Sequence, residues 1–288
     1  MSIFESIFLG IIQGITESMP VSSTANMILA KKIFSIAESS EFQSFITFIN
    51  VGTLSAVVIF YWEDCLKILR GFWEMIFQEK ILTKIKNIRT FLDQPNIMDL
   101  SEDKKIFLEV FIATVPSLII LGIMRCTFDV SRACNQYTLF IGILSAMVLV
   151  FFDLFSKTSM TKIKSFSHAF IIGIVQVFAV IPGVSRLGLC LTVMRLFGYS
   201  RTASLKFSFL LSIPILAADV FYNILFGNNC YTSGNESFWA LNMIPNLFAF
   251  LFGWLSLKFV TWFVKKHTFL LFCLYKIILF LYVFTIVL

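Results

Sequence analysis

An all-α polytopic membrane protein is the fold class that the sequence predicts, with residues 1–288 forming a single integral membrane domain. Residues of the AVILMFWYC set make up 58% of the chain and charged residues only 14%, and the mean hydropathy is +0.87. A soluble domain is about 25% charged, so this chain cannot cover a globular surface with polar groups. Its apolar runs are also continuous, whereas the strands of a transmembrane β-barrel alternate.

Six apolar runs are long enough to cross a bilayer, because a spanning helix needs about 20 residues. They cover roughly residues 44–62, 107–124, 137–155, 204–226, 239–263 and 268–288. Between the first two runs, the connector 63–106 carries 8 basic and 8 acidic residues. Mixed charge of this kind is typical of a solvated face, so we expect a cytoplasmic connector with an amphipathic surface helix and no catalytic role.

Two further apolar stretches, 3–33 and 169–198, are interrupted at Pro20 and Pro182. Proline removes an amide donor and disfavours helix in the residue before it, and the Ser and Thr residues that follow are good helix N-caps. Each stretch therefore predicts a re-entrant hairpin of two half-helices. Non-helical backbone at membrane depth must be covered by protein or line a polar cavity, so both breaks are expected inside the bundle.

The two broken stretches also resemble each other. GIIQ at 10–13 leads to PVSS at 20–23, and GIVQ at 173–176 leads to PGVS at 182–185, with one single-residue gap between the two registers. The sequence therefore predicts a repeat, over about 1–62 and 165–226. The number of crossings between the two units makes the repeats inverted, and inverted repeats with broken helices place a binding site near the bilayer midplane.

The net charge of +6 follows from topology rather than from a nucleic-acid partner, which we do not expect. Lys and Arg gather in the connectors around 157–164, 195–206 and 265–266. Cytoplasmic loops carry such an excess, so both termini are predicted to lie outside, although Lys31 and Lys32 would then also be outside. The six cysteines lack metal-ligand spacing and are interpreted as small apolar fillers.

Three polar features are unexpected in lipid-facing helices. Gln13 and Glu17 lie four apart and share one helix face, and a carboxylate within the membrane normally marks function. Ser22, Ser23 and Thr24 begin one half-helix, and Ser185 with Arg186 begins the other. Structural alternatives exist for each feature: an interfacial position for Glu17, plain N-capping by the serines, and an ion pair between Arg186 and Glu17.

Together these residues predict a site for a phosphorylated, lipidic ligand. Two half-helix N-termini offer free amides and positive dipole ends, and Arg186 offers a bidentate donor suited to phosphate. Glu17 would repel a bare phosphate. A divalent cation that bridges Glu17 and the phosphate removes this objection, so Glu17 is also the candidate metal ligand.

These motifs resemble those of a known family. The run QGITESMPVSST at 13–24 is similar to the first signature of the bacterial undecaprenyl-diphosphate phosphatase, or bacitracin-resistance, family. PGVSR at 182–186 and the segment 201–214 resemble its second signature and the part that follows. The resemblance implies a bacterial plasma-membrane enzyme that opens to the outer face, uses Mg²⁺ or Ca²⁺, and removes one phosphate from undecaprenyl diphosphate. That reaction recycles the lipid carrier of cell-wall (peptidoglycan) synthesis and confers bacitracin resistance.

The resemblance also implies roles for the site residues. Ser23 matches the proposed nucleophile, Glu17 belongs to the acidic motif and Arg186 to the phosphate-binding pair; the phosphate-binding positions comprise Gln13, Ser22, Thr24, Asn26 and Ser185. Asn26 stands where the family usually has His, Leu187 where it has Ser, and Cys190 where it has Thr. Since Asn cannot act as a general base, the proton transfer is expected to fall to Glu17 or to metal-bound water.

Two other functions remain open at this stage. Inverted repeats are also typical of transporters, so a polyprenyl-phosphate transporter or flippase is the first alternative. A homologue that binds lipid phosphate without turnover is the second. The expected partners are a polyprenyl diphosphate and membrane lipids, and the sequence leaves homo-oligomerisation open. His168 and His267 lie at connector ends and are interpreted as ordinary interfacial residues.

Overall fold

The computed structural model describes residues 1–36, 40–77, 100–127, 136–156, 159–181, 183–226 and 236–287. Within these ranges the regular structure is helical, apart from one isolated bridge between Met160 and Tyr199. The helices in chain order are α1 (Ile3–Glu17), α2 (Ser23–Ile33), α3 (Ser40–Phe60), α4 (Trp62–Phe77), α6 (Glu102–Thr127), α7 (Gln136–Phe155), α8 (Phe166–Val175), the 3₁₀ helix η4 (Gln176–Val180), α9 (Arg186–Leu196), α10 (Arg201–Phe226), α11 (Glu236–Lys266) and α12 (Leu270–Val287).

The prediction of an all-α polytopic membrane protein is confirmed at this level. In the part of the chain that the structure describes, three helical segments are long and apolar enough to cross a membrane: Glu102–Ile123, Arg201–Leu225 and Asn242–Lys266. A fourth candidate is the pair α3 and α4, which is bent by 85° at Tyr61, so α4 turns away from the direction of α3. The other predicted runs fall on the shorter apolar segments Phe140–Phe155 and Leu270–Val283.

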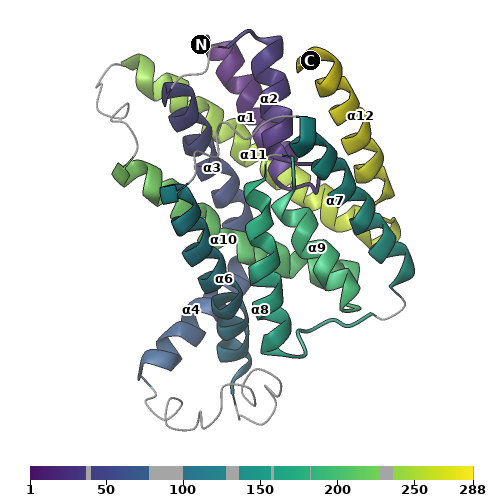
Figure 1. Ribbon diagram of the computed structural model, residues 1–288. Coiled ribbons are helices and arrows are strands. Elements are labelled where there is room, and N and C mark those ends of the chain that lie inside the picture. Colours follow the sequence, from purple (N-terminus) through teal and green to yellow (C-terminus); the bar gives the residue numbers. More distant parts are fainter. Residues whose placement is uncertain are drawn as a thin grey trace.

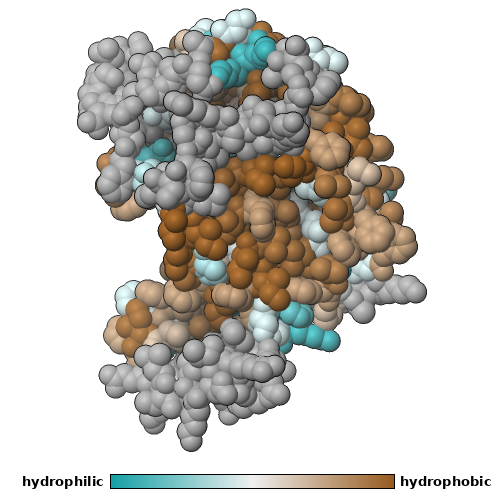
Figure 2. Space-filling model, in the orientation of Figure 1, coloured by the Kyte–Doolittle hydropathy of each residue, from teal (hydrophilic) through white to brown (hydrophobic). Residues whose placement is uncertain are grey.

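The surface has the character of a membrane protein. Many large apolar side chains on the outward faces of the helices are exposed, including Phe151 on α7 and Ile278 on α12. Figure 2 shows hydrophobic residues as a broad band across the middle of one face. Soluble monomers rarely expose contiguous apolar surface on this scale. We therefore expect this band to contact the acyl chains of a lipid bilayer.

The charged connector 63–106 is partly helical. Its first part forms α4, which lies at the end of the bundle opposite both chain termini (Figure 1). The last residues of the connector belong to α6, which begins at Glu102 rather than near residue 107. The charged residues of 78–99 lie outside the described residues.

Both broken stretches are interrupted where the sequence predicts. The first divides into α1 and α2, and the second into α8 with η4 and α9. Ser22 caps α2 by accepting from the Ala25 amide at 3.4 Å, and Ser185 caps α9 by accepting from the Gly188 amide at 3.2 Å. Pro182 itself lies outside the described residues, and Gly183 beside it adopts a φ of 90°.

Each hairpin packs against a long helix through glycine. A Cβ added at Gly10 of α1 would lie 2.4 Å from the Pro245 carbonyl oxygen of α11. A Cβ at Gly173 of α8 would lie 2.2 Å from the Ala113 carbonyl oxygen of α6. These close helix contacts exist only because glycine lacks the side chain, and they bring both hairpin breaks into the interior (Figure 1).

A buried charged cluster joins four helices at the other end of the second hairpin. Asp153 of α7 lies 2.9 Å from Arg195 Nε of α9 and 2.7 Å from Arg201 Nε of α10. Its second oxygen accepts from the Phe269 amide, beside the start of α12, at 3.2 Å. Arg195 also donates to the carbonyls of Asp153 and Ser156 at the end of α7. This cluster fixes α7, α9, α10 and α12 relative to one another.

Candidate active site

Glu17 is the centre of the polar site. It is the last residue of α1, at the point where the chain leaves the helix toward Pro20, and its side chain is 15% exposed. Gln13 lies one turn earlier and is buried. The 3.6-residue period of the helix therefore places both polar groups on the face that meets the break.

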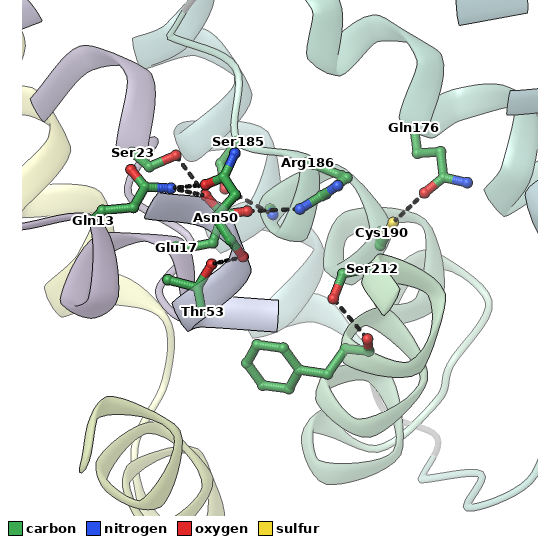
Figure 3. Close-up of polar contacts among 12 residues, drawn as sticks. Gln13, Glu17, Ser23, Asn50, Thr53, Gln176, Ser185, Arg186, Cys190 and Ser212 are labelled. Carbon is green, nitrogen blue, oxygen red and sulfur yellow. Dashed lines mark hydrogen bonds and ion pairs between the residues drawn. The ribbon is translucent and has the colours of Figure 1, made fainter. Parts of the chain in front are cut away.

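Three side chains donate to the Glu17 carboxylate. Ser23 Oγ donates to Oε2 at 2.7 Å, and Gln13 Nε2 donates to the same oxygen at 3.1 Å. Arg186 Nη2 donates to Oε1 at 2.6 Å, and its side chain is 20% exposed. Figure 3 shows Gln13, Ser23 and Arg186 converging on this carboxylate. The structure thus brings together residues 169 positions apart in the chain.

The two half-helix N-termini carry the polar groups that the sequence singles out. Ser22 has a φ of 68°, a left-handed conformation that costs a residue other than glycine about 1–3 kcal/mol and clusters at functional sites. Ser185 at the start of α9 has ordinary extended backbone. The first amides of α2 and α9 point out of the helix ends, where an anion is favoured by the helix dipoles. Thr24 lies on the exposed side of the first turn of α2.

Asn26 has a structural place beside the nucleophile candidate. Its Nδ2 donates to the Ser22 carbonyl at 2.9 Å, and its Oδ1 accepts from the Tyr275 hydroxyl at 2.5 Å. The side chain is buried, and both ends of its amide are used. Asn26 therefore holds the turn and α12 together, and Glu17 is the carboxylate in contact with Ser23.

Asn50 is a site residue that the sequence analysis did not single out. Its Oδ1 accepts from Gln13 Nε2 at 2.6 Å, so α3 holds the side chain that in turn donates to Glu17. Thr53 donates to the Asn50 carbonyl at 3.0 Å. An amide within the apolar run 44–62 was a usable signal, because a polar side chain at membrane depth needs a partner.

The second hairpin does not reproduce the first chemically. Gln176, which aligns with Gln13, donates to Ser117 Oγ and to the Ala113 carbonyl, the latter at 3.2 Å. Cys190 Sγ lies 3.8 Å from Gln176 Oε1 and is buried, as is Leu187. The second hairpin thus supplies Arg186 and Ser185 to the site, while its remaining polar groups fix α6, α8 and α9. The two histidines lie elsewhere: His168 bonds Tyr199 at 2.6 Å, and His267 stacks on Phe263.

The residues at the site fit a divalent cation that is shared with a phosphorylated ligand. Over the described ranges, no group of three or more His, Cys, Asp and Glu side chains could hold a metal ion by itself. Glu17 nevertheless supplies a carboxylate, with the Ser23 hydroxyl and the Asn50 amide nearby as further oxygen donors. Mg²⁺ is commonly held by one or two carboxylates together with substrate phosphates, and this donor set suits that mode.

Known proteins match this chain along nearly its whole length. The sequence model described as bacitracin resistance protein BacA matches residues 6–282. A protein named undecaprenyl-diphosphatase from Campylobacter fetus is 29% identical over 97% of this chain and 96% of its own length. Proteins with that name from Caldicellulosiruptor bescii and Clostridioides difficile are each 30% identical over 97% of this chain and cover 95% and 94% of their own lengths. By these matches the chain belongs to the bacitracin resistance protein BacA family.

Proposed function

We propose that this protein hydrolyses undecaprenyl diphosphate to undecaprenyl phosphate and inorganic phosphate. The relatives named undecaprenyl-diphosphatase and the family that the chain belongs to support this substrate. The reaction recycles the lipid carrier of cell-wall synthesis and underlies bacitracin resistance, the property for which the family is named. A bundle with apolar outward faces also suits a substrate that lies in the bilayer.

The contact between Ser23 and Glu17 is the observation that carries the proposal. Ser23 Oγ donates to Glu17 Oε2 at 2.7 Å, which is the distance expected for a nucleophile and its general base. Ser23 is also the first residue of α2, so a phosphate in front of its hydroxyl faces the helix N-terminus. The cap of α2 is Ser22, so capping does not account for the contact of Ser23 with a carboxylate.

In the first step, Ser23 Oγ attacks the terminal phosphorus of the diphosphate. The Ser23 proton passes to Glu17 as the new O–P bond forms, and the anhydride P–O bond breaks. Undecaprenyl phosphate leaves with the electron pair of that bond, and the phosphoryl group stays on Ser23. Arg186 and the first amides of α9 face the oxygens on which negative charge develops.

In the second step, water attacks the phosphoserine. Ser23 Oγ leaves and takes its proton back from Glu17, while both water protons depart with the product as dihydrogen phosphate. Glu17 returns to its charged form and again accepts from Ser23 and Arg186. Direct attack by water on the diphosphate is the alternative route, and it forms no bond to Ser23.

We further propose that Mg²⁺ or Ca²⁺ takes part at this site. Glu17 would hold the ion, with the oxygens of Ser23 and Asn50 beside it. When bound, the ion supplies positive charge that offsets the repulsion between Glu17 and the diphosphate. Gln13, which donates to both Glu17 and Asn50, keeps these oxygen donors together.

We also propose a membrane topology for the chain. It has six crossings and two re-entrant hairpins in an inverted repeat, and the site opens to the outer face of the plasma membrane. Three observations support it. Both termini lie at one end of the bundle and α4 at the other (Figure 1). The corresponding glycines make crossed contacts: Gly10 of the first repeat contacts α11, which follows the second repeat, and Gly173 of the second repeat contacts α6, which follows the first. The Lys-rich connectors fall on one side of the predicted crossings.

The test is phosphate release from undecaprenyl diphosphate by the purified protein in detergent. We expect turnover by the native protein and its loss in Ser23→Ala, with Ser55→Ala as the control, because Ser55 donates only to the Val51 carbonyl within α3. Substrate labelled in the terminal phosphate should leave label on Ser23 after acid quenching.

The outcomes separate the competing functions. Turnover without label on Ser23 would assign the attack to water. Lipid binding without phosphate release would favour the non-catalytic homologue. Movement of undecaprenyl phosphate across proteoliposomes by a protein that releases no phosphate would favour the flippase.

A further inference from the structure

Lys276 of α12 is a buried cation that the proposed reaction does not use. Its residue is only 1% exposed, and over the described residues it makes no ion pair with a carboxylate. Its Nζ donates to Ser145 Oγ of α7 at 3.1 Å and lies 5.7 Å from the centre of the Phe280 ring. An ammonium has three N–H donors, and a charge at membrane depth is costly without a counter-ion. An anionic ligand is the partner that this position lacks.

The depth of Lys276 follows from the contacts of α7. Gly142 of α7 lies against the Gly183 carbonyl oxygen, since a Cβ there would approach it to 2.9 Å. Eleven residues further on, the Asp153 carbonyl accepts from Arg195 of α9. The two helices therefore run side by side in the same direction. Ser145 and Arg186 each lie three residues beyond the Gly142–Gly183 contact, so they share one level in the bundle.

The neighbours of Lys276 connect it to both hairpins. Tyr275, the preceding residue, donates to Asn26 of α2 at 2.5 Å. Phe280, one turn further along α12, packs with Ala25 of α2 and contacts Gly142. The α12 face that carries Lys276 thus borders the start of α2, and α7 packs between α12 and α9 (Figure 1).

We propose that Lys276 and Ser145 form a second phosphate-binding position, which takes the phosphate on the lipid side of the polyprenyl diphosphate. This inference rests on the proposed function. It assigns each phosphate of the diphosphate to its own position: the terminal phosphate faces Ser23 and Arg186, and the lipid-linked phosphate faces Lys276. Arg186 already has a carboxylate partner in Glu17, whereas Lys276 has a hydroxyl. The long unbranched side chain lets Nζ exchange Ser145 for a phosphate oxygen, and Ser145 Oγ, which donates to the Gly142 carbonyl at 2.7 Å, can turn its proton to the same ligand.

The experiment compares Lys276→Met and Lys276→Arg with the native protein. Methionine keeps the length and apolar stem without the charge, and arginine keeps the charge. Lys258→Met is the matched control, because Lys258 also lies on a membrane helix but is exposed and stacks over Trp254 at 3.5 Å. Three quantities are measured: KM and kcat for undecaprenyl diphosphate, inhibition by undecaprenyl phosphate, and inhibition by inorganic phosphate.

We expect Lys276→Met to raise KM and to weaken inhibition by undecaprenyl phosphate by about tenfold or more, the factor that corresponds to one charge-assisted hydrogen bond. Inhibition by inorganic phosphate should change little, and Lys276→Arg should retain most of the lipid affinity. Weakened binding of inorganic phosphate alone would overturn the assignment to the lipid side. Native-like values for all three quantities in Lys276→Met would make the lysine purely structural and end the proposal.

Failure of the proposed function gives a different result. A native protein that releases no phosphate would remove the catalytic premise, and direct binding of undecaprenyl phosphate, followed by Trp fluorescence, would then decide whether Lys276 holds lipid phosphate. Thermal unfolding in detergent checks that each variant is folded. If Lys276→Met does not fold, Lys276→Gln, which keeps a polar head, replaces it in every measurement.

Discussion

Ser23 and Arg186 donate to opposite oxygens of one carboxylate, Glu17, although they begin half-helices from different parts of the chain. The contact with Ser23 orients the hydroxyl toward a base, and the contact with Arg186 neutralises that base while the site holds no substrate. A diphosphate in the site would compete with Glu17 for the guanidinium. Release of Arg186 from Oε1 frees the guanidinium for the phosphate, while Ser23 keeps its contact with Oε2.

Glu17→Gln should therefore lower kcat by about 10²–10⁴-fold, the usual contribution of a general base. Glutamine keeps the size and one oxygen but loses the negative charge that draws both a proton and a divalent cation. The measurement is phosphate release as a function of Mg²⁺ and Ca²⁺ after treatment with chelator. An unchanged metal response in the variant, or no response to chelator in the native protein, would contradict the role of Glu17 as a metal ligand.

Arg186→Ala should lower turnover by about 10²–10³-fold, because it removes a desolvated donor from the developing phosphate charge. Arg186→Lys should restore little of the activity, since a planar fork with two donors becomes a single point charge. Ser185→Ala provides the comparison, because it removes the cap at Gly188 without removing the charge. Native-like turnover in Arg186→Ala would exclude the residue from phosphate binding.

The main features of the fold could be predicted because they depend on local chemistry. Proline followed by serine predicts both helix breaks, and long apolar runs predict the helices that line them. Boundaries were less accurate where charge and helix overlap: α6 begins at Glu102 inside the charged connector. The run 44–62 followed by an amphipathic surface helix matches α3 and α4, but the angle of 85° between them could not be predicted, since Tyr61 is neither proline nor glycine.

The sequence alone predicted the charged residues of the site but missed some of the uncharged and distant ones. Glu17 and Arg186 are charged residues in apolar sequence, so the sequence could predict that they lie close together, either around a shared phosphate ligand or as an ion pair. Asn50 was missed in the apolar run 44–62, and Tyr275 and Lys276 were missed in the run 268–288, because neither run carries a motif around these residues. Their relevance comes from tertiary contacts with Gln13, Asn26 and Ser145, which no spacing along the chain encodes.

Asp153→Asn should destabilise the protein by about 3–5 kcal/mol, the usual cost of removing one partner from a buried ion pair. Asp153 is fully buried between Arg195 and Arg201, so the variant leaves Arg195 charged and without its carboxylate. Glu102→Gln is the contrasting variant, because the Glu102–Lys162 pair is exposed and surface pairs contribute little. Thermal unfolding in detergent measures the stability of both variants. Equal losses of stability would show that the buried Asp153 ion pairs stabilise the protein no more than the exposed Glu102–Lys162 pair.

Asn26 stands at the position where the resemblance described above implies His. Asn26 is buried one turn from Ser23, and its amide bonds the Ser22 carbonyl and the Tyr275 hydroxyl. An imidazole at this place could keep one of these contacts and carry a proton as well. Asn26→His should therefore raise turnover, by about tenfold, which is less than the full value of a general base because Glu17 already contacts Ser23.

The pH–rate profile distinguishes this gain from a packing effect. An unperturbed His has a pKa of about 6.5, so if the imidazole acts as a base, the added activity should be lost as the pH falls through that range. Asn26→Gln changes the size of the side chain without adding an ionisation, and Tyr275→Phe removes the hydroxyl that would compete for the imidazole. We expect the new titration in Asn26→His, a sharper gain when Tyr275→Phe is combined with it, and no titration in Asn26→Gln. Superimposable profiles for Asn26→His and the native protein would show that position 26 carries no proton in this enzyme, which would leave Glu17 as the base for Ser23.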